Sequence, residues 1–175
     1  MRRFGKIALA AILAAMPVAA HATDLLTVPA GNMAVPVADT GFDWNGFYAG
    51  VFGTVQNSSV GGFQYGAGID LGVNARLEFA LVGGEIALRG LDGGTGYASA
   101  LGKVGIALTD DVVLYGAGGL GTSFAGPAES DVLVGGGLEL AVADDVTLDA
   151  RYLHAFPVSG ANPKDQFSVG ANFHF

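Results

Sequence analysis

Apolar and polar residues alternate along most of the chain from Trp44 onward. The pattern predicts eight strands, each long enough to cross the hydrocarbon core of a bilayer, which takes about 9 to 11 tilted residues. Successive side chains of a strand point to opposite sides, so alternation gives each strand two chemically different faces. The predicted strands cover residues 46–56, 62–73, 76–90, 96–108, 112–124, 131–142, 146–157 and 166–175.

Four of these segments separate an apolar face from a face of glycine and isolated charges. In segment 76–90 the apolar Leu81 falls on the face of Glu85, which leaves a change of register near Gly83 open. Segment 112–124 carries apolar and small residues on both faces, so its pattern does not predict which face points inward. The four regular segments are 62–73, 96–108, 131–142 and 146–157.

The connections alternate between tight polar turns and longer loops. LTDDVV (108–113) and VADDVT (142–147) are near copies of each other, and a third turn is expected at Asn74 in GVNARL. Asp and Asn are favoured in turns because their side chains bond nearby backbone groups. The other connections, QNSSVG, LDGGTG, AGPAES and SGANPKD, are longer. Short turns on one rim and longer loops on the other predict an all-β fold, an eight-stranded antiparallel up-and-down transmembrane β-barrel.

Composition supports a barrel in a membrane over a soluble exported β-barrel that binds a ligand. The chain is 51% hydrophobic with 29 glycines, but only 14% of its residues are charged. A solvated surface usually carries about 25–35% charged residues, so the glycine-rich face suits a narrow interior better. After the first 22 residues no apolar run approaches the 18 or more that a transmembrane helix needs.

Seven charged residues fall on the faces predicted to point inward. An eight-stranded barrel is just wide enough inside to be filled by side chains. An unpaired charge sealed there would cost several kcal/mol, so we expect an internal ion-pair network. The use of the same residues as an ion path is the alternative. They are Asp70, Glu85, Arg89, Lys103, Glu139, Asp149 and Arg151.

Residues 1–22 have the three-part pattern of a secretory signal peptide, with a basic start, an apolar run and the small-x-small site Ala20-His21-Ala22. Cleavage after Ala22 would leave a Pro- and Ala-containing periplasmic lead at 23–43 and a barrel at 44–175. It would also remove three of the 8 basic residues and none of the 16 acidic ones. So acidic a chain is not expected to bind nucleic acid.

The stretch FDWNGFYAGVFG, from Phe42 to Gly53, resembles the first strand of the small alphaproteobacterial outer-membrane β-barrel proteins. That family is close to the transmembrane domain of OmpA and to the opacity-like porins. The residues that match are Trp44, Gly46, Phe47 and Tyr48 in the opening, and Phe175 at the end. The resemblance implies a barrel of the cell outer membrane whose partners are membrane lipid and the barrel assembly machinery.

Aromatic residues gather at the start of the first predicted strand and at the end of the last. We expect Trp44, Phe47, Tyr48, Phe173 and Phe175 to form part of one aromatic girdle at the membrane interface. The resemblance further implies that Phe167, Phe173 and Phe175 form the signal that the assembly machinery recognises. Strand 166–175 is expected to pair with strand 46–56, because hydrocarbon tolerates no unpaired edge.

No enzyme motif is expected. Beyond the signal peptide the histidines are His154 and His174, and no pattern brings Ser159 to His154 as a nucleophile needs. We expect no catalytic, cofactor-binding or metal-binding residues. The sequence therefore predicts a non-enzymatic structural or surface protein with a polar-filled, closed interior, and a narrow pore is the alternative.

Overall fold

The computed structural model describes residues 41–58, 62–126, 128–159 and 163–175. The predicted signal peptide and all but the last three residues of the predicted lead lie outside the described residues. Within the described part of the chain, no helix is long and apolar enough to span a bilayer.

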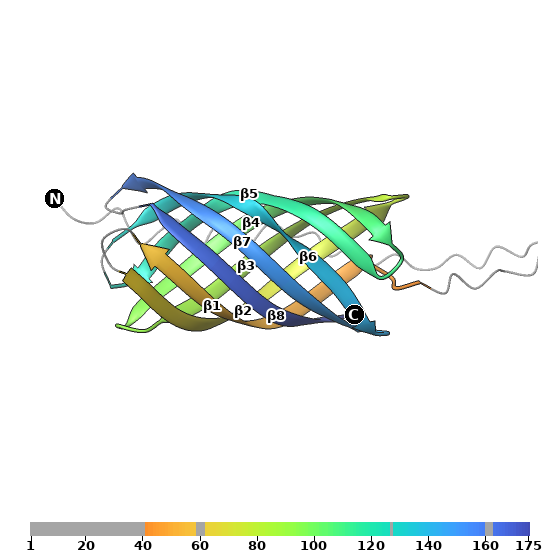
Figure 1. Ribbon diagram of the computed structural model, residues 1–175, viewed down its shortest axis with the longest axis horizontal. Helices are drawn as coiled ribbons and strands as arrows, with labels where there is room; N and C mark the ends of the chain where they lie inside the picture. The colour runs from red at the N-terminus through yellow and green to blue at the C-terminus, as the bar shows by residue number, and fades with distance from the viewer. Residues whose placement is uncertain (1–40, 59–61, 127, 160–162) are drawn as a thin grey trace, which may run out of the picture. The chain divides into compact units, whose positions relative to one another are not determined.

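Eight antiparallel strands form one closed barrel, and they run at a tilt around it (Figure 1). Each strand pairs with its neighbours in sequence, and β1 pairs with β8. The predicted up-and-down barrel is confirmed. The strands are β1 (Gly46–Ser58), β2 (Gly62–Leu77), β3 (Ala80–Leu91), β4 (Thr95–Thr109), β5 (Val112–Ala125), β6 (Ser130–Ala143), β7 (Val146–Ser159) and β8 (Lys164–His174).

The pairing of β1 with β8 closes the barrel. It runs from Tyr48 opposite His174 to Ser58 opposite Lys164, along nearly all of both strands. This is the seam expected from the sequence. Closure leaves no strand edge whose backbone N–H and C=O groups would lie unpaired in hydrocarbon.

The barrel has two rims. The short-turn rim carries the turns at 78–79, 110–111 and 144–145, and the start of β1 and the end of β8 lie there too (Figure 1). The loop rim carries the other four connections. The turn expected at Asn74 is wrong, because β2 continues to Leu77 and Asn74 points into the barrel. The chain reverses at Glu78 instead, which takes a positive φ of 58°.

The structure orients the two strands that the sequence pattern left open. In β5, Tyr115 points inward, whereas Leu114 and Leu120 are exposed on the outer wall. In β3 the pairing with both neighbours is continuous past Gly83, so the register does not change there. Leu81 is an apolar residue inside the barrel, where it belongs to the same buried cluster as Phe42, Trp44 and Val113.

Candidate functional site

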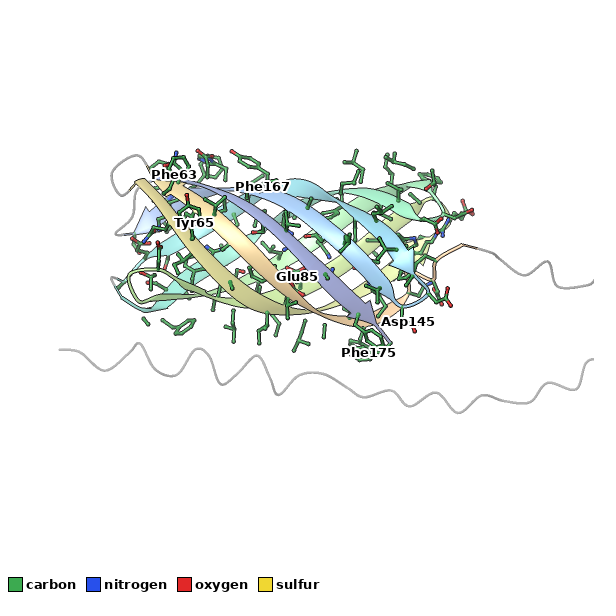
Figure 2. All side chains as sticks on the ribbon, turned by 60° about the horizontal axis from the view of Figure 1, so that its bottom comes forward. Phe63, Tyr65, Glu85, Asp145, Phe167 and Phe175 are labelled. Atoms are coloured by element: carbon green, nitrogen blue, oxygen red, sulfur yellow. The ribbon has the colours of Figure 1, made fainter. Side chains whose placement is uncertain are left out.

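The side chain of Glu85, on β3, lies inside the barrel about midway between its two ends and is fully shielded from solvent (Figure 2). Arg151 on β7 donates two hydrogen bonds to its carboxylate, one of them with Nη2 2.9 Å from Oε2. Lys103 on β4 lies 3.3 Å from Oε2, and Tyr48 Oη on β1 donates to the same oxygen at 2.7 Å. Side chains from three other strands therefore meet on one carboxylate.

Arg151 connects this carboxylate to a second one on its own strand. Its Nη2 lies 3.1 Å from Asp149 Oδ1, and its Nε donates to Tyr115 Oη at 2.9 Å. Tyr115 in turn donates to Asp149. Glu85, Lys103, Arg151 and Asp149, with two tyrosines, form a single connected set that we call the central cluster.

Both tyrosines of the central cluster lie over glycines of the neighbouring strand. Tyr48 is the cross-strand partner of Gly72, and Tyr115 is the partner of Gly137. At either glycine a β-carbon would collide with the tyrosine ring or its hydroxyl. Glycine on the inner face therefore leaves the volume that a tyrosine fills.

Glu139, on β6, has a separate set of neighbours. Thr147 Oγ1 donates to its Oε1 at 2.6 Å and Asn172 Nδ2 donates at 3.1 Å. His174 Nε2 lies 3.4 Å from the same oxygen, which makes an ion pair when the imidazole is protonated. Thr147 lies on β7, and Asn172 and His174 lie on β8. The Glu139 carboxylate therefore links β6 to β7 and β8 inside the barrel.

Asp70 and Arg89 are buried inside the barrel but belong to no ion pair among the described residues. The expectation of one network that includes them is therefore wrong. Alternation assigns a residue to the inner face but gives no height along the axis, and Arg89 lies nearer the loop rim than the carboxylates of the central cluster. There it donates to Gln166 Oε1 at 2.6 Å and lies 4.1 Å above the Tyr97 ring.

A second layer of charges lies near the loop rim, and it was not predicted from the sequence. Tyr97 Oη donates to Asp131 at 2.8 Å, and Lys164 pairs with Glu129 and lies 3.8 Å from Asp131. The alternation of segment 131–142 already put Asp131 on its polar face. Lys164 lay outside the predicted strand 166–175, so the pattern gave it no face.

Aromatic residues close the interior at the short-turn rim. Phe42 and Trp44, which precede β1, are buried there, with Trp44 0% exposed. Their ring centroids lie 4.7 Å apart, and Phe42 lies 4.9 Å from the His174 ring. Trp44 Nε1 donates to the backbone carbonyl of Asp110 at 2.8 Å, which ties this aromatic cap to the turn between β4 and β5.

Two polar residues fix the segment that carries the cap. The backbone N–H and the side-chain amide of Asn45 both donate to Asp43 Oδ1, at 3.0 and 2.9 Å, and these bonds lower the pKa of the Asp43 carboxyl. Asn45 Oδ1 accepts the backbone N–H of Arg76 at 2.8 Å. The segment is therefore bonded to the end of β2.

The predicted aromatic girdle is wrong for Trp44 and Tyr48, which lie inside the barrel. Trp44 precedes the first strand, where alternation no longer applies, and Gly46 takes a φ of 115° that turns the chain at the strand start. Tyr48 follows the inward parity of β1. Phe47 and Phe175 do point outward, and their rings stack with centroids 6.5 Å apart.

Other aromatics are exposed on the outer wall near the loop rim. Figure 2 shows Phe63, Tyr65 and Phe167 toward that end of the barrel, and Phe175 at the other end beside the Asp145 turn. The residues of the expected assembly signal, Phe167, Phe173 and Phe175, all point outward. The outer wall thus carries aromatic side chains at both levels, separated by Val, Leu, Ile and Ala.

His154 lies on the outer wall, where its Nδ1 is 2.8 Å from Asp165 Oδ1. The same oxygen accepts the hydroxyl of Tyr152 at 2.6 Å. Within the described ranges, no hydrogen bond joins Ser159 to this histidine, and no group of three His, Cys, Asp or Glu residues could hold a metal ion. The cluster on the outer wall thus joins His154, Asp165 and Tyr152 through one carboxylate oxygen.

No protein-family model matches the sequence, and no curated protein matches it. Solved structures do. Ail, the attachment invasion locus protein of Yersinia pestis, is similar over 74% of this chain and 96% of its own, with 17% identity and a TM-score of 0.54. Neisserial surface protein A is similar over 74% and 97%, with 16% identity and a TM-score of 0.51. A de novo designed transmembrane β-barrel has 11% identity and a TM-score of 0.50 over 73% and 95%. The fold of this chain is that of an eight-stranded transmembrane β-barrel.

Proposed function

We propose that this chain is a non-enzymatic barrel of the bacterial outer membrane whose interior is closed to the passage of ions and solutes. The observation that carries the proposal is the set of bonds on Glu85. Groups from β1, β4 and β7 reach the carboxylate of a β3 residue, so side chains bridge the lumen. The aromatic cap of Phe42 and Trp44 adds a second obstruction at the short-turn rim.

The division of polar and apolar residues supports a place in a membrane. Most charged residues of the strands point inward, whereas Arg76 and Asp165 lie close to the rims. Large apolar side chains such as Val51, Ile69 and Val104 are exposed on the outer wall between them. A charge on the lipid-facing wall costs about 2–4 kcal/mol at the bilayer midplane and little near the interfaces, which suits this distribution.

The proposal extends to the family and the partners expected from the sequence. The opening around Trp44, Gly46 and Phe47 supports membership of the small alphaproteobacterial OmpA-like and opacity-like barrels, with the assembly machinery as a partner through the outward phenylalanines. One of the similar structures, Neisserial surface protein A, is by its name a surface protein. The loop rim would then face the outside and the short-turn rim the periplasm.

Cell fractionation combined with surface proteolysis tests the location. The full chain is expected in the outer-membrane fraction, with cleavage by added protease confined to the loop rim, because the short turns would face the periplasm. Migration in detergent gels should change on heating. Recovery of the protein in the periplasm without detergent would support a soluble barrel and contradict the proposal.

Planar-bilayer recording tests the closed interior. Refolded protein is expected to leave the bilayer conductance at the lipid baseline, because Glu85, Arg151 and the two tyrosines fill the lumen. A wide porin inserted in the same bilayers serves as the positive control. Steady single-channel currents from the refolded protein would establish the narrow pore in place of the closed barrel.

A further inference from the structure

A small cavity with a mixed polar and apolar lining lies in the interior between the central cluster and the loop-rim layer. Its volume is about 20 Å³, which is enough for one water, since one needs about 10–15 Å³ by the same measure. Polar walls come from Asp70, Arg89 and Asn172, and Phe52 and Leu153 supply apolar ones. The cavity therefore suits a small polar guest.

Two acceptor oxygens face each other beside this cavity. A β-carbon on Gly50 would collide with both Asp70 Oδ1 and Asn172 Oδ1, so the two oxygens flank the same point. The amide nitrogen of Asn172 donates to Glu139 at 3.1 Å, which turns the amide oxygen toward Asp70. Two facing acceptors repel each other unless a donor lies between them.

Buried polar atoms with no partner line the same cavity. Asp70 is 5% exposed and its Oδ1 has no hydrogen-bond partner among the described residues. Arg89 is 7% exposed, and its Nε has none among them either. Leaving such groups buried and unpaired is unfavourable, because each loses its hydrogen bonds to water. Two of the residues that line the cavity therefore carry an unpaired acceptor and an unpaired donor.

We propose that this cavity is a binding site for a single ordered water that bridges Asp70 and Asn172. The water donates one hydrogen to Asp70 Oδ1 and the other to Asn172 Oδ1, and Arg89 is the donor that completes its shell. A sodium ion suits the site less well, because the guanidinium groups of Arg89 and Arg151 both line the cavity. The bound water joins Asp70 to Arg89 and, through Asn172, to the set of side chains around Glu139.

A crystal structure of the refolded barrel, at a resolution that places waters, tests the site directly. We expect one isolated solvent peak within hydrogen-bond distance of Asp70 Oδ1 and Asn172 Oδ1. Water-¹⁷O relaxation dispersion counts the long-lived waters in solution. It is expected to show one fewer in Gly50→Ala than in the parent, because a β-carbon at Gly50 collides with both oxygens and displaces the two acceptors that hold the water.

Gly53→Ala is the matched control, since Gly53 lies on the same strand and a β-carbon there meets nothing within 4 Å. This variant should keep the parent's count of long-lived waters. If Gly50→Ala does not refold, the crystal structure of the parent protein alone decides. Three results would overturn the proposal. The first is that rubidium replaces the solvent peak, which would identify a cation site. The second is a direct hydrogen bond between Asp70 and Asn172 with no solvent peak. The third is a continuous column of solvent along the barrel axis.

Discussion

Replacing Glu85 by Gln is expected to lower the free energy of unfolding by about 3–5 kcal/mol, the loss seen when one partner of a buried ion pair is removed. Gln keeps the shape of the side chain but loses its charge, which leaves Lys103 without its ion-pair partner and Arg151 with only Asp149. Urea titration of the protein refolded into lipid vesicles measures the effect, with the heat-modifiable gel shift as the signal of the folded barrel.

Asp144→Asn is the control for the loss of one negative charge. Asp144 is exposed in the turn between β6 and β7, and surface changes of this kind usually stay within about 0.5 kcal/mol. The free energies of unfolding of the two variants should therefore differ by several kcal/mol. Equal stability of Glu85→Gln and Asp144→Asn would show that the central cluster contributes nothing beyond its packing.

Replacing Trp44 by Ala is the second change with a large expected effect. A fully buried Trp or Phe truncated to Ala typically costs about 3–5 kcal/mol, through lost burial and the cavity that remains. Here the change removes the indole ring that packs against Phe42 and His174, and the hydrogen bond to the Asp110 carbonyl. The same urea titration measures the loss.

Phe47→Ala is the control for Trp44→Ala, because Phe47 is about half exposed on the outer wall, two residues into the first strand pairing. It should destabilise the barrel less. Trp44 is also the single tryptophan of the chain, so its fluorescence reports the cap alone. Brominated lipids should quench it weakly. Strong quenching would place the side chain in the lipid-facing girdle and contradict the structure.

Alternation predicted the direction of side chains correctly in the strands where apolar and polar residues alternate regularly. The inward placement of Lys103, Glu139 and Asp149 follows from parity alone, because a one-residue shift would put each charge into lipid. The paired Asp-Asp turns located two of the three short connections. The third short connection was predicted at the wrong place, at Asn74. An inward-pointing polar residue near the end of a strand cannot be told from a turn residue by sequence alone.

Partnerships inside the barrel could not be read from the sequence. Arg89 and Asp131 are on the correct face, but the height of a side chain depends on the stagger between strands, which closure sets for all eight strands together. Trp44 was missed for another reason. Its position follows from contacts with the Asp110 turn and His174, which lie far along the chain, and not from any local period.

The fit of Tyr48 over Gly72 and of Tyr115 over Gly137 limits how this sequence can change. Each ring and its glycine occupy one shared space, although they lie on different strands. A larger residue at Gly72 has room only after Tyr48 has become smaller, whereas at Gly137 the backbone carbonyl of Ala150 also blocks a β-carbon. In related sequences we therefore expect a larger residue at the position of Gly72 only together with a smaller residue at the position of Tyr48, and glycine retained at the position of Gly137.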